Sequence, residues 1–293
     1  MYQKNLGRQI WATLSPMLVY NIIVYIVQLI FSGIIYVQNL DKIAALVGKT
    51  PEEVRMAAAK IIYDVIIEYQ VEMMGIAALC SVPVLLFMMR KDYKKEIVAG
   101  ILQNTKAPLT KYVLVACISI PFSLGLNNLI LYSNLASYSE AYQESAEVFY
   151  GADLVIQIVC LGVLTPLVEE LIFRGLIYKR VKMMMNNPRN AMIFSSLLFG
   201  FYHGNFVQIL YGCLSGFLLA YLYEKFGSVK APILAHILMN LTMLMLTEAN
   251  TFVWMFENIL RMGIITVACA AIASTVFLFI QKIDEKPLKI EEN

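Results

Sequence analysis

The chain is short of charged residues. Only 15% of its 293 residues are Asp, Glu, Lys or Arg, while 59% are hydrophobic and the mean hydropathy is +0.68. A soluble domain is about one quarter charged and about half apolar. A water-soluble chain of this length cannot bury so much apolar surface, so we expect an integral membrane protein. The formal net charge of +2, without a basic patch, argues against nucleic-acid binding.

The sequence also lacks the short motifs of several soluble enzyme classes. It has no HExxH, no GxSxG, no P-loop and no GxGxxG. Its cysteines stand singly in apolar runs, and none is in CxxC spacing, which argues against a disulfide framework and a thiolate metal site.

Long apolar runs predict an all-α fold, namely a polytopic bundle of about eight transmembrane helices, because a spanning helix needs about 20 mostly apolar residues. The fifth and seventh spans are short or interrupted. We expect one membrane domain, with N-terminal helices over 1–150, a core over 151–248, and a last helix and tail over 249–293. The predicted spans are 14–38, 71–89, 111–133, 152–178, 191–205, 206–224, 231–248 and 256–281.

One helix is predicted between the first two spans. In TPEEV at 50–54, Thr50 is a suitable N-cap, Pro51 suits the first helical position, and two glutamates favour the first turn. Residues 51–68 then place Ala and Ile on one face and charged residues on the other. We expect this helix to lie outside the bilayer or to extend the second span.

Lysine and arginine predict the orientation. When the spans alternate, seventeen of these residues fall on the side of the N-terminus, Lys4, Lys286 and Lys289 among them. Four fall on the other side, namely Lys42, Lys49, Arg55 and Lys60. Because cytoplasmic loops carry an excess of Lys and Arg, we expect both termini in the cytoplasm. The lack of large cytoplasmic domains favours a bacterial plasma membrane.

Ionisable side chains inside a membrane helix are costly and therefore mark candidate functional sites. The fourth span contains LTPLVEELIFR, in which Glu170 and Arg174 are four residues apart and share a helix face. Glu169 points about 100° away and has no local partner. We expect a structural ion pair between Glu170 and Arg174, and a Glu169 that is free for chemistry. The alternative is that both acids belong to the cytoplasmic end of the helix.

The chain has two histidines, and both lie in apolar helical stretches. His203 ends SSLLFGFYH, with Phe199 one turn earlier, and His236 in APILAHILMN lies one turn before Asn240. A histidine on an apolar face is most often a packed core residue. In a membrane span, however, imidazole needs a polar partner, which favours a functional site.

Glu169, His203 and His236 come from three spans, and helix bundles collect such groups in their interior. Two kinds of chemistry remain open. The three side chains can bind a divalent metal such as Zn²⁺ and lower the pKa of a bound water to about 7. Alternatively, Glu169 and His203 can deprotonate a water directly. Asn240 and His236 can stabilise an oxyanion, so both routes end in hydrolysis of an acyl bond.

The three motifs together resemble the CPBP family of intramembrane proteases, also called the Abi or CAAX-protease family. EELIFR at 169–174 fits EExxxR, FGFYH at 199–203 fits FxxxH, and HILMN at 236–240 fits HxxxN. The likeness covers about residues 150–245. It implies an eight-helix core with a polar cavity that opens toward the cytoplasm. It also implies that Glu169 and His203 activate water, and that His236 and Asn240 form an oxyanion site.

Members of this family are described as metalloproteases, whereas a glutamate mechanism without a catalytic metal has been argued for relatives. Zinc held by Glu169, His203 and His236 is therefore one of two expectations. The expected partners are membrane lipid and a hydrophobic or lipidated peptide or protein substrate.

Two other classes of function stay open. A transporter or proton-coupled carrier would use Glu169, the histidines and Arg174 as a relay, although the sequence has no inverted repeat. A non-catalytic bacteriocin-immunity or regulatory membrane protein would keep its effect after Glu169→Ala.

Overall fold

The computed structural model describes residues 6–44, 50–101 and 105–283, and within these every regular element is a helix. Seven segments of this described part are long and apolar enough to cross a membrane. The chain is therefore an integral multi-pass membrane protein, which confirms the predicted fold class. Lys4, Lys49, Lys286 and Lys289 lie outside the described residues. The seven segments are Leu6–Gln38 (α1), Gln70–Val98 (α4), Leu109–Tyr132 (containing α5, Tyr112–Tyr132), Leu154–Met185, Phe206–Phe226 (α11), Lys230–Glu248 (α12) and Ile259–Gln281 (α14).

The predicted span at 191–205 forms a shorter helix than a full span requires. Helix α10 covers Pro188–Phe201, or 14 residues, which corresponds to about 21 Å against a bilayer core of about 30 Å. Asn187 caps its first turn, and Gly204, with φ +80°, turns the chain toward α11. Of the eight predicted spans, seven correspond to helical segments long enough to cross a membrane, and the eighth, α10, is shorter.

Helices α10 and α11 form an antiparallel hairpin with close backbone contact. A Cβ atom built on Gly200 would lie 2.3 Å from the Cys213 sulfur, and one built on Gly212 would lie 2.9 Å from the Gly200 Cα. Small residues permit this approach between helices in a membrane. The hairpin brings the end of α10, where His203 follows, against the first half of α11.

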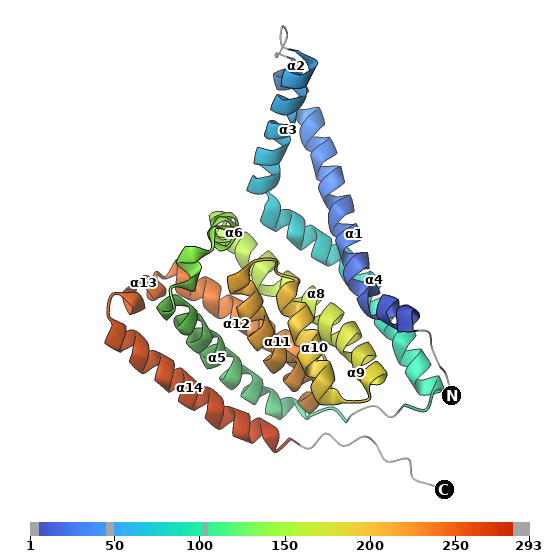
Figure 1. Cartoon of the computed structure of the whole chain (residues 1–293), viewed down its shortest axis with the longest axis vertical. Coiled ribbons are helices and arrows are strands. Elements are labelled where there is room, and N and C mark those ends of the chain that lie inside the picture. The colour runs from blue at the N-terminus through green and yellow to red at the C-terminus, as the bar shows by residue number, and fades with distance from the viewer. Residues whose placement is uncertain (1–5, 45–49, 102–104, 284–293) are drawn as a thin grey trace.

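The helix predicted at 51–68 is confirmed as α3, Pro51–Glu68. The Thr50 side chain accepts from the Glu53 backbone N–H, and the Glu53 carboxylate accepts from the Thr50 backbone N–H, which is a capping box. Tyr69 alone separates α3 from α4. In Figure 1, α3 and the end of α1 extend beyond the rest of the bundle, with α2 (Leu40–Ala44) at the tip.

The segment 154–185 is one continuous helix with two stretches of wider, π-helical turns. The π-helical stretches cover Gln157–Leu164 and Leu171–Tyr178, and they flank α8, Thr165–Glu170. The segment begins with α7, Leu154–Ile156, and ends with α9, Lys179–Met185. π-helical turns occur frequently at functional sites, and here they enclose the two adjacent glutamates.

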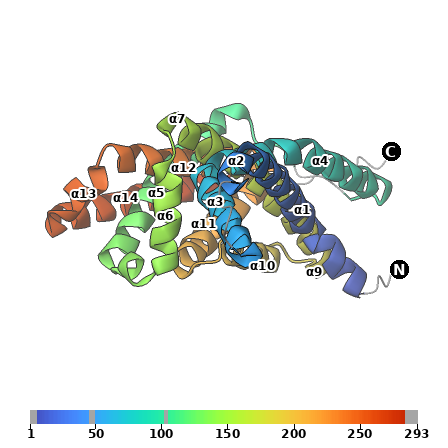
Figure 2. The same cartoon turned by 90° about the horizontal axis from the view of Figure 1, so that it is seen from above.

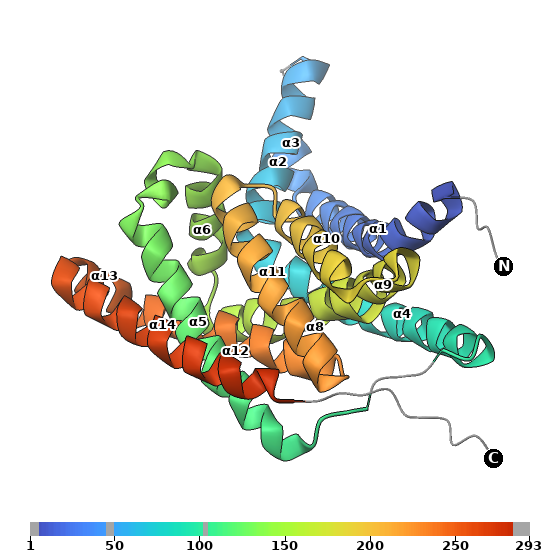
Figure 3. The ribbon, with the colours of Figure 1, turned by 60° about the horizontal axis from the view of Figure 1, so that its bottom comes forward.

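Helix α12 lies in the centre of the bundle, in contact with α5, α8, α11 and residues 157–164. Seen from above, α13 (Thr251–Phe256) and α14 lie at one end of the molecule and α4 at the other (Figure 2). Helix α5 runs beside α14 (Figure 3). Helix α6, Glu140–Gly151, lies at the end of the bundle where α5 and α12 finish (Figure 1). Short 3₁₀ turns at Leu109–Lys111 and Leu135–Tyr138 complete the elements.

Two ion pairs hold the C-terminal part of the segment 154–185 in place. Lys179 lies 2.8 Å from Glu96 and Arg180 lies 2.6 Å from Asp92. Both pairs join α9 to the end of α4. They hold the segment 154–185 against α4, and hence fix the position of the glutamates near its middle.

Candidate active site

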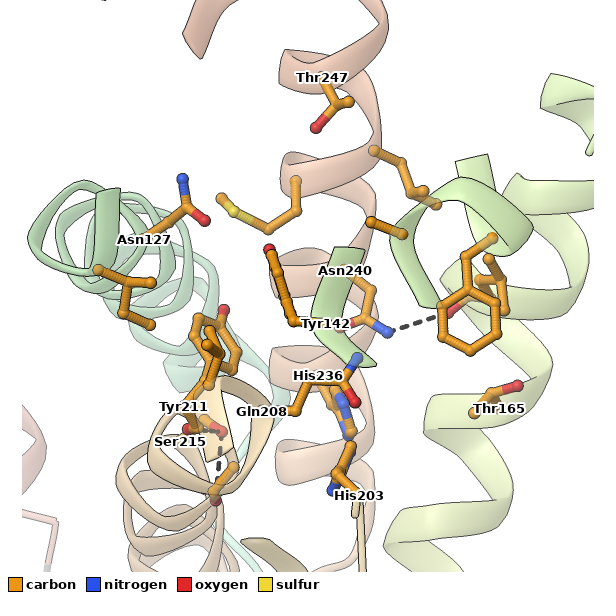
Figure 4. Close-up of a pocket in the computed structure, with 18 of the residues that line it drawn as sticks. Asn127, Tyr142, Thr165, His203, Gln208, Tyr211, Ser215, His236, Asn240 and Thr247 are labelled. Carbon is orange, nitrogen blue, oxygen red and sulfur yellow. Dashed lines mark hydrogen bonds between the residues drawn. The ribbon is translucent and has the colours of Figure 1, made fainter. Parts of the chain in front are cut away.

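The predicted site residues converge on one cavity. Glu169 from α8, His203 after α10, and His236 and Asn240 from α12 all line a cavity of about 530 Å³. Figure 4 shows His203 and His236 near one another at one end of this space, with Thr247 at the other end. Three segments that are far apart in the sequence therefore bring their ionisable groups together inside an apolar bundle, as the motif spacing predicts.

Glu170 and Arg174 form the buried ion pair that the sequence predicts. Both side chains are 0% exposed, and Arg174 Nη1 lies 2.7 Å from Glu170 Oε1. Arg174 Nη2 donates to the Gly216 carbonyl oxygen at 2.8 Å, which links the pair to α11. We call Glu170, Arg174 and the Gly216 carbonyl the clamp. Neither residue of the pair lines the cavity.

Phe199 separates the clamp from the cavity. It is 1% exposed, and the Arg174 guanidinium carbon lies 4.5 Å from its ring centre. Its ring also makes edge contacts with His203, at 4.9 Å, and with His236, at 5.7 Å. The first residue of the FxxxH motif therefore positions both imidazoles and stacks on the guanidinium, an arrangement that favours cation–π attraction.

Glu169 points to the cavity side of the same helix. It is 8% exposed, and its Oε2 lies 3.7 Å from Nε2 of His236. That distance is too long for a hydrogen bond. It is short enough for one water molecule to contact both atoms, so Glu169 is placed to act on a water in the cavity.

The hydrogen bond of His203 determines its tautomer. Its Nδ1 lies 2.8 Å from the backbone oxygen of Phe199. A carbonyl oxygen can only accept, so Nδ1 carries the hydrogen and Nε2 of the neutral ring keeps a lone pair. The Phe199 carbonyl thus orients His203 with its basic nitrogen available to the cavity.

His236 connects the clamp with the cavity. Its Nδ1 lies 2.9 Å from Glu170 Oε1, and its Nε2 faces Glu169. A carboxylate oxygen accepts, so the Nδ1 of His236 also carries a hydrogen. Carboxylate contacts of this kind fix the orientation of an imidazole. Glu170, although outside the cavity, therefore sets the position of a side chain inside it.

Asn240 is held by a carbonyl group that a proline leaves free. The Asn240 side-chain NH₂ donates to the Leu161 oxygen at 2.9 Å. In the π-helical stretch each N–H bonds five residues back, as Thr165 does to Cys160. The next donor would be Pro166, which has no N–H. Leu161 is therefore free to accept from Asn240, whose amide keeps a second N–H for a ligand.

The side chains of the three predicted zinc ligands are not grouped so that they could hold one metal ion. Across the described ranges, no set of three or more His, Cys, Asp or Glu side chains is grouped to hold a metal ion. Each histidine uses Nδ1 in the contact described above, which leaves one nitrogen each for other partners. Zinc binding by Glu169, His203 and His236 therefore stays a prediction.

The cavity also contains polar residues that the motifs do not include. Gln208, Tyr211 and Ser215 of α11 line it together with Tyr142 of α6 and Thr247 of α12 (Figure 4). The α11 residues occur at positions i, i+3 and i+7 in the mainly apolar first half of the helix. Polar residues at helical spacing within a membrane span are a signal for a lined cavity, so the sequence contained a pattern that could have identified them.

A known protein family matches the part of the chain that holds the site. Residues 151–242 match the family model described as "Type II CAAX prenyl endopeptidase Rce1-like". The chain is also similar to a Bacillus subtilis (strain 168) protein described as "Putative membrane peptidase YdiL", with 31% identity over 121 residues. This match covers 41% of the chain and 48% of the relative, so the chain spans about half of that relative's length. No solved structure matches the chain.

All three sequence motifs lie inside the segment that the family model matches. The predicted likeness is therefore confirmed for this segment: residues 151–242 are similar to the type II CAAX prenyl endopeptidase family.

Proposed function

We propose that the chain is an intramembrane endopeptidase that hydrolyses a peptide bond in a hydrophobic, membrane-associated or lipidated substrate. The observation that carries this proposal is that Glu169, His203, His236 and Asn240 line one cavity in a membrane bundle. Ionisable side chains at membrane depth are costly, and these are arranged around a space that a substrate can fill. The family match over residues 151–242 supports the same activity.

In the proposed first step, a water molecule in the cavity attacks the carbonyl carbon of the scissile bond. Glu169 or Nε2 of His203 takes the proton of this water as it attacks. A carbon–oxygen bond forms and the carbonyl oxygen becomes an oxyanion. In the neutral ring the Phe199 carbonyl holds the hydrogen on Nδ1 of His203, so Nε2 has the lone pair that a base requires.

Asn240 is the proposed donor to that oxyanion, through the N–H that Leu161 does not use. His236 can add a second donor from Nε2 only when both of its ring nitrogens carry hydrogen. The tetrahedral intermediate then collapses as the carbon–nitrogen bond breaks. The proton taken from water passes to the leaving nitrogen, and the products are a carboxylate and an amine.

The test uses the protein purified in detergent and a mixed pool of prenylated and unmodified hydrophobic peptides. Cleavage is followed by mass spectrometry for the wild type, Glu169→Gln and His203→Ala, each with and without a chelator. We expect the wild type to cut and both variants to lose cleavage. The chelator arm tests the predicted zinc directly. Cleavage that persists in Glu169→Gln, or no cleavage by any form, would contradict the proposal and favour a carrier or an immunity protein.

We also propose that both termini lie on the cytoplasmic side of a bacterial plasma membrane. Lys and Arg residues gather toward the C-terminal ends of α4, α9 and α11, at the end of the bundle opposite α6 (Figure 1). In this orientation the α6 residues that line the cavity face away from the cytoplasm. The family likeness implied a cavity open to the cytoplasm, so the two expectations conflict.

Labelling of single cysteines distinguishes these two orientations. The five native cysteines are replaced, and Glu144→Cys on α6 or Lys230→Cys at the start of α12 is added; both positions are exposed. With a membrane-impermeant maleimide on intact cells, we expect labelling at residue 144 and none at residue 230. The reverse pattern would place the α6 end, and the cavity with it, on the cytoplasmic side.

A further inference from the structure

The part of the cavity that leads from the catalytic groups toward α6 is polar but uncharged. It is lined by Tyr142 of α6, by Gln208 and Tyr211 of α11, and by Asn127 and Thr247 at the ends of α5 and α12 (Figure 4). Apolar side chains lie between them, including Phe149, Leu131 and Met243. No lysine or arginine is present among the described residues that line the cavity, and Glu169 is the one carboxylate among them.

Tyr211 has a buried hydroxyl group without a hydrogen-bond partner in the described part of the chain. Buried polar groups are nearly always paired in native structures, so an unpaired one requires an explanation. Tyr211 lines the cavity, and a hydroxyl can donate one hydrogen bond and accept two. The explanation that fits its position is that a ligand in the cavity supplies the partner.

Tyr142 faces the same space from α6. Burial raises the pKa of this phenol above its ordinary value, and the nearby Tyr150 adds to the effect, so Tyr142 is a neutral donor at physiological pH. The face of α6 toward the cavity also includes Ala146 and Phe149, whereas Glu140, Glu144 and Glu147 occupy other positions of the helix. The α6 helix therefore presents an uncharged face to the cavity.

We propose that this tyrosine-lined part of the cavity is the subsite for an uncharged stretch of the peptide substrate beside the scissile bond. In it the Tyr211 hydroxyl donates a hydrogen bond to a backbone carbonyl of the substrate. The proposal rests on the proposed endopeptidase function and deepens it. A peptide in an apolar cavity needs partners for its backbone groups, and neutral hydroxyl and amide side chains supply them.

The absence of lysine and arginine from the described lining restricts the class of substrate. A free C-terminal carboxylate in this subsite would have no cation to pair with, and the Glu169 carboxylate would repel it. Burial of an unpaired charge is strongly unfavourable. The subsite therefore suits a chain that continues through it, and recognition does not depend on a free C-terminal carboxylate.

The first test is Tyr211→Phe, measured by peptide cleavage and by thermal unfolding. We expect KM to rise about threefold to tenfold, as for the loss of one hydrogen bond to a neutral partner, with kcat little changed. We expect no fall in Tm, because phenylalanine keeps the ring and removes a hydroxyl that has no hydrogen-bond partner among the described residues. The matched control is Tyr221→Phe, on the same helix but against Phe277 and away from this cavity. An unchanged KM, or a fall in Tm together with activity, would overturn the role of Tyr211.

The second test measures binding and does not depend on cleavage. A fluorescent apolar peptide of about 12 residues is prepared with a C-terminal carboxylate and with a C-terminal amide. Both are titrated into His203→Ala in lipid nanodiscs, because this variant keeps Glu169 and Tyr211. We expect the amide to bind at least as tightly as the acid. Tenfold tighter binding of the acid, or binding of neither, would overturn the subsite.

The two tests separate this inference from the proposed function. A peptide that binds as expected but is not cut by the wild type supports the subsite and contradicts the endopeptidase. A peptide that is cut only as the free acid supports the endopeptidase and contradicts the subsite.

Discussion

Glu169 and Glu170 are neighbours in the chain and lie in two different regions of the site. Glu170 belongs to the clamp, with Arg174 and His236 as partners and no exposure. Glu169 lines the cavity, and its Oε2 lies 3.7 Å from Nε2 of His236. The step of about 100° between successive helical residues is enough to place one carboxylate behind Phe199 and the other in the cavity.

The comparison shows how one helix can supply both a supporting side chain and the proposed reactive group. In the clamp, Oε1 of Glu170 contacts both Arg174 and His236, and Arg174 reaches the Gly216 carbonyl, so the clamp connects the segment 154–185 with α11 and α12. In the cavity, Glu169, Nε2 of His203 and one N–H of Asn240 keep capacity for further partners. Precise placement of reacting groups requires such support from the residues behind them. We therefore expect clamp variants to act first on stability and cavity variants first on activity.

The largest effect is expected from breaking the clamp with Arg174→Met. This change leaves the Glu170 carboxylate buried without its cation, which destabilises by about 3–5 kcal/mol for a buried pair. We expect a clear fall in Tm or loss of folded protein, measured by thermal unfolding in detergent. The control is Arg189→Met, at an exposed position at the start of α10, which should leave Tm unchanged. Equal Tm values for the two variants would contradict the clamp.

A large effect on activity is expected from His203→Ala. Loss of a general base lowers the rate by roughly 10²- to 10⁴-fold, whereas the half-buried ring makes a hydrogen bond to a backbone carbonyl and an edge contact with Phe199. We expect kcat/KM to fall by that factor while Tm changes little. Phe201→Ala removes an exposed ring from the end of the same helix and should retain activity. A variant at His203 that cleaves at the wild-type rate would remove this residue from the mechanism.

A somewhat smaller effect is expected from Asn240→Ala. Removal of one oxyanion donor lowers kcat by about 10²- to 10³-fold in known cases. The free Leu161 carbonyl lies at the cavity, so we expect a modest change in Tm. The readout is kcat at saturating peptide. A rise in KM with an unchanged kcat would indicate that Asn240 binds the substrate and does not stabilise the oxyanion.

The smallest effect is expected from Pro166→Ala, which sharpens the account of how Asn240 is held. Alanine restores a backbone N–H that can donate to Leu161 in place of Asn240. We expect cleavage to fall by several-fold while the helix is no less stable, because the new hydrogen bond contributes about 1 kcal/mol. Val168→Ala changes a buried position of the same short helix without adding a donor. Loss of activity in Val168→Ala alone would indicate that packing, and not the Leu161 carbonyl, positions Asn240.

Much of the fold followed from the sequence because apolar runs and caps act locally. The capping residue Thr50 and the bounds 51–68 were predicted correctly, as was the ion pair of Glu170 with Arg174. The bounds of α10 were not, because an apolar run does not show that the helix ends at Phe201 and that Gly204 turns the chain. The π-helical turns around α8 depend on tertiary packing, so spacing alone could not predict them.

The candidate site likewise has features that the sequence predicted and features that it did not. The motifs identified the four residues that share the cavity, since their residue types are rare in membrane spans. They did not show that His236 contacts Glu170, because the histidine lies 66 residues away along the chain. Tyr211 was missed although it lies on a polar stripe of α11, because a tyrosine in an apolar span is also an ordinary packing residue.

The most direct test of the account compares Glu169→Gln with Glu170→Gln. Both variants remove one negative charge from adjacent residues and keep the shape of the side chain. Peptide cleavage and Tm are measured for each in the same detergent. We expect Glu169→Gln to lose cleavage at a Tm close to that of the wild type, and Glu170→Gln to show a clear fall in Tm. A Glu169→Gln variant that still cleaves, or a Glu170→Gln variant as stable as the wild type, would contradict the division between cavity and clamp.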